Sequence, residues 1–224
     1  MCTVSFVPIK DGYCITSNRD EIITRERAIY PKKYIINNKE VYFPKDPKAG
    51  GTWFAHDTKN CVVLLNGAQD KHISKEKYRK SRGLIVTQLI ASQNPINEWY
   101  LADLKDIEPF TVVLFFNEKL FQLQWNELEK SSIELDVTKS HFWSSSTLYE
   151  KIIREERANW FNDFMSSENL NSQKLLDFHQ YTENNNAFYG LQINRDGLLK
   201  TVSITQAIIS NDKDIKLTYI DLLD

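Results

Sequence analysis

Two β-strand-like segments joined by a short turn open the chain and constrain its fold more than any other feature. Residues 2–9 and 13–18 are rich in β-branched and aromatic side chains, and Asp11-Gly12 stands between them. This dipeptide is typical of a tight hairpin turn. Because hairpin strands are antiparallel, the end of the second segment returns to the beginning of the first. We therefore expect Cys2 to neighbour residues 18–21, which read Asn-Arg-Asp-Glu.

The same pairing of strands recurs along the chain. Asn117-Glu118 and Asp196-Gly197 each separate two further strand-like segments, and we expect a hairpin at each. Residues 61–67 form a continuous apolar run that is typical of a strand buried on both faces. The last strands are expected at residues 187–193, 199–206 and 215–220.

Helices are expected between these groups of strands. Residues 78–92 carry an apolar stripe, and Asn94-Pro95 supplies a cap and a first-turn residue for a short helix through Leu101. A capping box at residues 147–150 is expected to open a long helix, and another helix covers residues 173–181. The long helix should present one apolar face, composed of Leu148, Ile152, Trp160, Phe161 and Phe164.

The order of these elements predicts an α+β fold, in which helices cover antiparallel sheets. The segment around Pro31 reads as irregular and basic. A chain of 224 residues, 42% of them hydrophobic, can bury a full core, and we assign residues 1–224 to a single domain.

Composition excludes several classes of function. A net charge of −2 gives no electrostatic footprint for nucleic acid, and no apolar stretch approaches the length of a membrane span. The three cysteines lack disulfide or metal-ligand spacing, which favours a cytoplasmic protein in which Cys14 and Cys61 are small buried hydrophobes. The four histidines lack metal-site spacing and no nucleotide-binding motif occurs, so we expect no metal, no cofactor and a small-molecule ligand or substrate.

Several short motifs follow one another in the order of a known family. The chain begins Met-Cys and continues with NRDE at residues 18–21, GGTW at 50–53, LLN at 64–66 and SRG at 81–83. With its C-terminal TVSITQ and YIDLL, it resembles the NRDE-motif family of transport-and-Golgi-organisation type. That family is similar to N-terminal nucleophile hydrolases. The resemblance implies a four-layer αββα sandwich, in which two antiparallel sheets pack face to face between helix layers.

The resemblance also implies a chemistry for the start of the chain. In cysteine-type enzymes of this class, the thiol of the first residue attacks an amide carbonyl and its own α-amine carries the proton. Cys2 would become that residue if Met1 were removed. Asp20 would then hold the protonated α-amine of Cys2, and Arg19 would favour the thiolate form of its side chain. Asn66 would face the oxyanion of the tetrahedral intermediate. The residues expected to bind substrate are Asn18, Gly51, Thr52, Trp53 and Trp143.

Each of these assignments has a structural alternative. Cys2 can simply start a strand behind a retained Met1, and Arg19 and Asp20 can form an ion pair. Adjacent strand residues point to opposite faces, and related cysteine acylases space their arginine and aspartate three apart, which leaves the role of Arg19 open. Asn66 is also typical of a turn, Gly50-Gly51 of a tight turn, and both tryptophans of a core.

Two classes of function are compatible with the sequence. The first is an amidohydrolase that cleaves a small non-peptide amide with Cys2 as nucleophile. The second is a binding or trafficking protein that keeps the hydrolase fold and carries lipid, acyl-coenzyme A or haem. Whether the mature chain begins at Cys2 discriminates between them.

Overall fold

The computed structural model describes residues 3–167, 170–212 and 214–223. The chain forms two compact units, one comprising the chain up to Arg25 and from Thr138 onward, the other comprising Glu26–Val137. Within the described residues, each unit carries one antiparallel sheet and two α-helices. The α+β class predicted from the order of elements is therefore confirmed.

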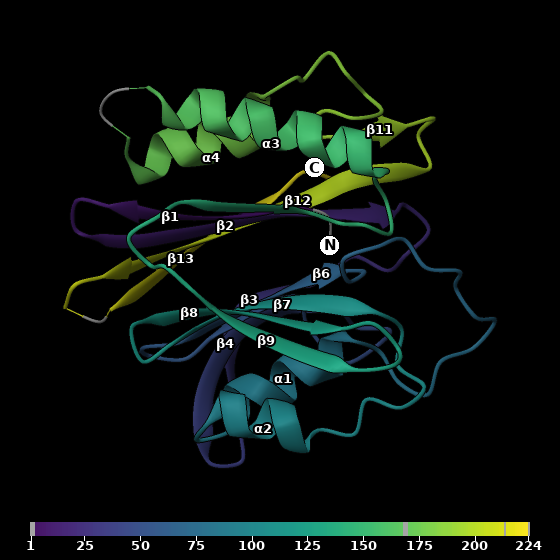
Figure 1. Ribbon diagram of the computed structural model, residues 1–224, viewed down its shortest axis with the longest axis vertical. Coiled ribbons are helices and arrows are strands. Elements are labelled where there is room, and N and C mark those ends of the chain that lie inside the picture. The colour runs from purple at the N-terminus through teal and green to yellow at the C-terminus, as the bar shows by residue number, and fades with distance from the viewer. Residues whose placement is uncertain (1–2, 168–169, 213, 224) are drawn as a thin grey trace. The chain divides into compact units, whose positions relative to one another are not determined.

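The first unit is built on a sheet of six described strands. Their order is β10 (His141–Ser144), β1 (Thr3–Ile9), β2 (Gly12–Ile22), β12 (Leu199–Ser210) and β11 (Asn194–Arg195), and β13 (Ile215–Asp221) also pairs with β12. Two helices, α3 (Lys151–Met165) and α4 (Ser172–Tyr181), lie next to one another on one face of this sheet (Figure 1). The hairpin of β1 and β2 is the one predicted at Asp11-Gly12.

An aromatic core joins these helices to their sheet. Val7 and Cys14 contribute the sheet side, and Phe161 and Phe178 contribute the helix side. The two phenylalanine rings meet edge to face, with 5.7 Å between their centroids. This packing fixes which residues of β1 and β2 face the helices, because side chains alternate along a strand.

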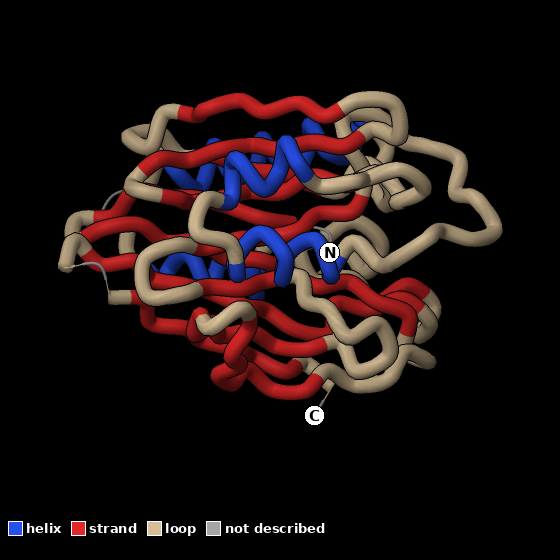
Figure 2. Tube along the Cα trace, turned by 90° about the horizontal axis from the view of Figure 1, so that it is seen from below, coloured by secondary structure: helices blue, strands red, loops and turns tan. Residues whose placement is uncertain are grey.

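The second unit contains a seven-stranded sheet within the described residues, and its strands are neighbours in chain order. The strands are β3 (Ile29–Ile36), β4 (Lys39–Lys45), β5 (Phe54–His56), β6 (Cys61–Asn66), β7 (Phe110–Phe116), β8 (Lys119–Trp125) and β9 (Lys130–Leu135). Helices α1 (Gly83–Ala91) and α2 (Pro95–Leu101) lie side by side, and α1 contacts β4, β5 and β6 (Figures 1 and 2).

Local signals predicted several boundaries of these elements correctly. Asn94 caps α2 by accepting a 3.0 Å hydrogen bond from the backbone N–H of Asn97. Asn117 and Glu118 both have positive φ, 51° and 61°, which is the backbone of the favoured two-residue hairpin turn. None of the helices in the described residues is long and apolar enough to cross a bilayer.

Other expectations were wrong, and each has a physical reason. The segment around Pro31 is strand β3, an edge strand where a proline and lysines are tolerated. Residues 187–193 form turns instead of a strand, and β9 was not anticipated because this second edge strand is largely polar. The capping box does not form, because Glu150 is itself the N-cap of α3. Ile152 lies on the exposed side of α3.

Candidate functional site

The Asn-Arg-Asp-Glu segment lies inside β2, directly beside the start of β1. The hairpin register pairs Thr3 with Asn18. Cys2, the expected nucleophile, lies outside the described residues. Residues 18–20 therefore lie at the end of the hairpin where β1 begins. This is the arrangement that the turn at Asp11-Gly12 predicts.

Asn18 faces the helices and is fully buried. Its Nδ2 donates to the carbonyl oxygens of His179 at 3.0 Å and Leu191 at 2.7 Å. Its Oδ1 lies 2.6 Å from Nδ1 of His179. Because an amide oxygen only accepts, Nδ1 carries the proton, and Nε2 accepts from the hydroxyl of Ser5 at 2.7 Å. The Asn18 amide thus joins β2 to α4 and to the segment before β11, and its role in substrate binding stays a prediction.

His179 remains neutral in this environment. Burial lowers the pKa of His179 to about 3, and the positive charge of Arg157 lowers it further in the same direction. A neutral imidazole is what the hydrogen bonds require, since one ring nitrogen donates to Asn18 and the other accepts from Ser5.

Asp20 also faces the helix side of the sheet and is 5% exposed. Its Oδ1 accepts a 2.6 Å hydrogen bond from the hydroxyl of Thr201, and its Oδ2 accepts a 2.9 Å hydrogen bond from the phenol of Tyr149. No cation lies within ion-pair distance of this carboxylate among residues 3–167, 170–212 and 214–223. A buried carboxylate that retains free lone pairs is suited to hold one more positively charged donor.

A buried arginine on α3 packs against Tyr149, which bonds to Asp20. Arg157 is 0% exposed, and its guanidinium carbon lies 4.0 Å from the centroid of the Tyr149 ring. Its Nη2 donates to the hydroxyl of Thr3 at 2.9 Å and to the carbonyl of Gly190 at 3.3 Å. Contacts therefore run without a gap from Asp20 on β2, through Tyr149 and Arg157, to Thr3 on β1.

Neither Tyr149 nor Arg157 belongs to a motif that predicted a site residue. One signal was present for the arginine, because residues 157, 161 and 164 are spaced by four and three and so share a helix face with the core phenylalanines. Tyr149 was missed because it is one of residues 147–150, which were expected to form a capping box.

Arg19 lies on the opposite face of β2 from Asp20, as the alternation of strand side chains predicts. Its Nη2 forms an ion pair with Oε2 of Glu21 at 3.1 Å, and Nε of Arg25 lies 3.6 Å from the same oxygen. Arg19 therefore pairs with Glu21 and not with Asp20. The partner strand β12 carries a bulge between Thr201 and Ser203, which are opposite Asp20 and Arg19.

In the second unit, the structure brings the GGTW and SRG motifs together. A Cβ added to Gly51 would lie 2.4 Å from the carbonyl carbon of Gly83, so only glycine allows this approach. The N–H of Thr52 donates to the carbonyl of Gly83 at 3.2 Å, and its hydroxyl donates to the carbonyl of Pro44 at 2.6 Å. The packing of these two segments thus explains why a glycine occupies position 51 and a threonine position 52. Their role in substrate binding stays a prediction.

The remaining predicted residues lie on strands or next to them. Trp53 is buried, with 3% of its surface exposed, and precedes β5. Asn66 ends β6, and Gly67 follows with φ 85°, as expected for a turn at this point. Trp143 lies on β10 opposite Val4 and stacks on His141, with 5.8 Å between ring centroids.

Cys14 and Cys61 have the character of core residues. Burial raises the pKa of the Cys14 thiol to about 12 and raises that of Cys61 well above its ordinary value. Neither thiol is therefore a competent nucleophile near neutral pH. The prediction that both are small buried hydrophobes is confirmed.

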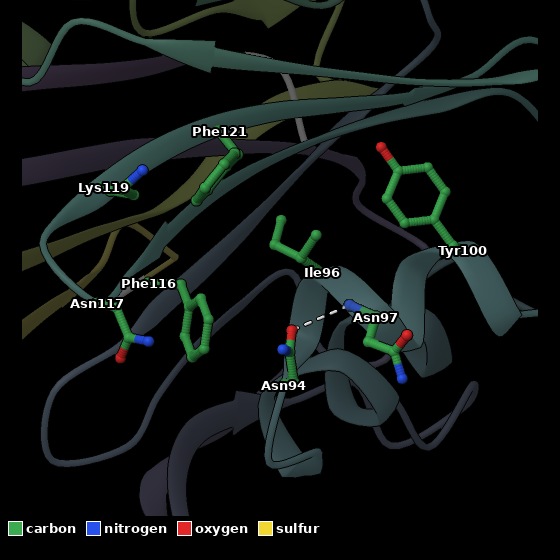
Figure 3. A pocket seen from close by; sticks show the side chains of 8 residues that line it. All are labelled: Asn94, Ile96, Asn97, Tyr100, Phe116, Asn117, Lys119 and Phe121. Atoms are coloured by element: carbon green, nitrogen blue, oxygen red, sulfur yellow. Dashed lines mark hydrogen bonds between the residues drawn. The ribbon is translucent and has the colours of Figure 1, made fainter.

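A surface hollow of about 430 Å³ lies on the second unit (Figure 3). It is open and lined by α2 with its cap and by the β7–β8 hairpin: Asn94, Ile96, Asn97, Tyr100, Phe116, Asn117, Lys119 and Phe121. It contains no predicted site residue. In the described part of the chain, no group of three or more His, Cys, Asp or Glu side chains is arranged to hold a metal ion.

Comparison with known proteins identifies the family. The model of the family "Transport and Golgi organisation 2" matches residues 1–216. The chain belongs to this family. A search of curated proteins gave no match.

Solved structures show which fold the family member adopts. Penicillin V acylase from Agrobacterium tumefaciens matches with a TM-score of 0.51 and 7% identity, over 99% of this chain and 86% of that one. A variant of conjugated bile acid hydrolase from Clostridium perfringens gives a TM-score of 0.49 and 9% identity, over 99% and 92% of the two chains. The fold is thus N-terminal nucleophile hydrolase-like, as the resemblance implied.

Proposed function

We propose that this protein is a cysteine N-terminal nucleophile amidohydrolase that cleaves a small non-peptide amide. Cys2 is the nucleophile once Met1 has been removed, and its α-amine is the base. The observation that carries the proposal is the environment of Asp20, a buried carboxylate held by Thr201 and Tyr149 with no cation partner in the described residues. Cys2 is bonded to Thr3, and Thr3 is in register with Asn18, two residues before Asp20.

An α-ammonium group is the cation that Asp20 would hold. The α-amine titrates near about 7.7 to 8.0 and a cysteine thiol near about 8.5, so the two groups of one residue have nearly matched pKa values. A fixed carboxylate beside the amine would orient its lone pair toward the thiol and stabilise the ammonium that forms when the thiol proton is transferred.

The reaction then proceeds in two steps. The Cys2 sulfur forms a bond to the carbonyl carbon, and the α-amine receives the thiol proton and passes it to the leaving nitrogen as the C–N bond breaks. Water next attacks the thioester, giving its proton through the amine to the sulfur and releasing the carboxylic acid. Asn66 would donate to the oxyanion in both steps, and Arg19 would favour the thiolate.

The start of the mature chain tests this proposal without a known substrate. Intact mass should show that Met1 is absent, and brief iodoacetamide treatment near neutral pH should label Cys2 first. The internal controls are Cys14 and Cys61, whose raised pKa values predict slow labelling in the folded protein. A retained Met1, or labelling of Cys2 no faster than that of the two core thiols, would leave only a binding protein with a hydrolase-like fold.

A further inference from the structure

The open hollow on the second unit has two apolar walls, one from a helix and one from a hairpin. Ile96 and Tyr100, which are one helical turn apart on α2, form the first wall. Phe116 and Phe121 of the β7–β8 hairpin form the second wall, on the opposite side of the hollow (Figure 3). Phe116 is opposite Lys119, and Phe121 is two residues further along β8, so all three lie on one face of the sheet. Both walls belong to the same unit, so the shape of the hollow depends on that unit alone.

These apolar walls remain in contact with water. Tyr100 is 58% exposed, and Ile96, Phe116 and Phe121 are each half-buried. The face of an aromatic ring carries partial negative charge, so it attracts the C–H groups of a ligand as well as apolar surface. The volume of the hollow, about 430 Å³, lies within the range of small-molecule sites, which is about 300 to 1,000 Å³. The walls are therefore suited to the apolar face of a small ligand.

Three asparagine side chains add hydrogen-bonding groups to the hollow: Asn94, Asn97 and Asn117. Oδ1 of Asn94 accepts from the backbone N–H of Asn97 at 3.0 Å, and Nδ2 of Asn94 donates to no described residue. The carboxamides of Asn97 and Asn117 also have no hydrogen-bond partner within the described part of the chain. The backbone positions two of the three, because Asn94 caps α2 and the N–H of Asn117 donates to Oδ1 of Asn60 at 3.3 Å. The hollow thus offers neutral donors and acceptors that are held in place before a ligand binds.

Lys119 is the charged member of the lining residues, and a carboxylate matches its charge. Its Nζ lies 3.0 Å from both carboxylate oxygens of Glu134. Glu134 on β9 is opposite Phe121, so the ion pair lies on the same face of the sheet as the hairpin wall. An anionic ligand would compete with Glu134 for the ammonium group, and a cationic ligand would be repelled by Lys119. A neutral ligand avoids both costs.

We propose that the hollow binds the pyranose ring of a neutral sugar. One face of such a ring presents C–H groups, which fit the aromatic walls, and its edge carries hydroxyls. Each hydroxyl both donates and accepts hydrogen bonds, as each free carboxamide does. A purely apolar ligand would remove water from the carboxamides of Asn97 and Asn117 without replacing its hydrogen bonds, which costs free energy. No residue of the hollow takes part in the proposed reaction at Cys2, so the sugar site and the reaction can be tested separately.

Small probes that share a six-membered ring test the sugar site. The neutral probes are the methyl glycosides of glucose, galactose and mannose. Methyl glucuronoside adds a carboxylate, and methoxycyclohexane keeps a ring of similar size but lacks the hydroxyls. At least one neutral glycoside should bind the protein with a Kd of about 1 mM, about tenfold more tightly than methyl glucuronoside or methoxycyclohexane. Titration followed by the NMR signals of the protein amides measures each Kd, and the signals that shift should belong to residues of the hollow.

Tyr100→Ala tests the contribution of the aromatic wall. The change should weaken binding of the neutral glycoside about fivefold to tenfold, because it removes a ring face. Tyr181→Ala is the matched control, since Tyr181 is 56% exposed and does not line the hollow. This variant should keep the affinity of wild type. Equal affinity of the two variants would contradict the sugar site.

Asn117→Gly tests the contribution of the carboxamides. Asn117 has a φ of 51°, so glycine suits the turn and the change removes only the carboxamide. Binding of the neutral glycoside should weaken about fivefold. Asn37→Gly is the matched control, because Asn37 opens the β3–β4 turn with the same φ of 51° and does not line the hollow. If the two variants bind the glycoside equally well, the carboxamide of Asn117 does not contact the sugar and the proposal is wrong.

Three further results would each overturn the sugar site. The first is that none of the three neutral glycosides binds. The second is that methyl glucuronoside or methoxycyclohexane binds as tightly as they do. The third is that the shifted signals belong to residues outside the hollow. Because binding is measured without turnover, none of these results depends on whether Cys2 is a nucleophile.

Discussion

The phenol of Tyr149 donates a 2.9 Å hydrogen bond to Oδ2 of Asp20, across 129 positions of sequence. This bond connects the segment before α3 to the Asn-Arg-Asp-Glu segment. It also connects Asp20 to the buried guanidinium of Arg157, which lies on the Tyr149 ring. The carboxylate that we expect to orient the nucleophile is therefore positioned by a residue that no sequence motif marks.

Tyr149→Phe should destabilise the protein and impair the Cys2 reaction together. Removing the hydroxyl leaves one buried oxygen of Asp20 without a donor, which should lower the free energy of unfolding by about 1.5 to 3 kcal/mol. Urea denaturation measures the loss, and the rate of Cys2 alkylation as a function of pH measures the effect on the site. Tyr181→Phe is the control, because Tyr181 is 56% exposed. Equal stability of the two variants would contradict the role given to the hydrogen bond.

The stability of the protein should fall between pH 6.5 and pH 3 because of His179. Its pKa is lowered from 6.5 to about 3 in the folded state, so in this window the unfolded state binds the proton and the folded state does not. The contribution of His179 to the free energy of unfolding is thus fully present above pH 6.5. It is lost as the pH falls, by about 1.4 kcal/mol for each pH unit. Urea unfolding of wild type and His179→Gln across this range isolates the contribution. Parallel pH profiles for the two proteins would show that His179 does not titrate as the structure predicts.

Gly51→Ala should be strongly destabilising, although the backbone there is not left-handed. The new methyl group would meet the backbone of Gly83 at 2.4 Å, and neither side of this contact is a flexible side chain. We expect a loss of about 2 to 3 kcal/mol in the free energy of unfolding. Gly197→Ala is the matched control: its φ of 72° is unfavourable for alanine but its surroundings are open, so the loss should be about 1 kcal/mol. A smaller loss at Gly51 than at Gly197 would contradict the close packing of the two motifs.

Local sequence determined much of the fold and one part of the site. The β1–β2 hairpin, the cap of α2 and the β7–β8 hairpin follow from neighbouring residues, and all were predicted. Strand alternation also predicted that Arg19 and Asp20 face opposite sides of the sheet. Edge strands β3 and β9 were missed because their faces are half polar, so neither shows a clear apolar pattern.

The surroundings of the site depend on contacts that no local pattern encodes. Asn18 finds its partner in His179, 161 positions away, and the burial of Arg157 depends on how α3 lies on its sheet. The sequence could therefore predict candidate site residues, but not the residues that contact them in the fold.

Turnover by wild type and by Cys2→Ser tests the central claim most directly. The change is nearly isosteric at the end of the chain, so folding should be unaffected and thermal unfolding should coincide for the two proteins. The measurement is the release of amine from a panel of small acyl amides at neutral pH. The account predicts that wild type cleaves at least one amide and that Cys2→Ser cleaves it slower by orders of magnitude. Equal turnover by the two proteins, or none by wild type, would contradict a Cys2 nucleophile.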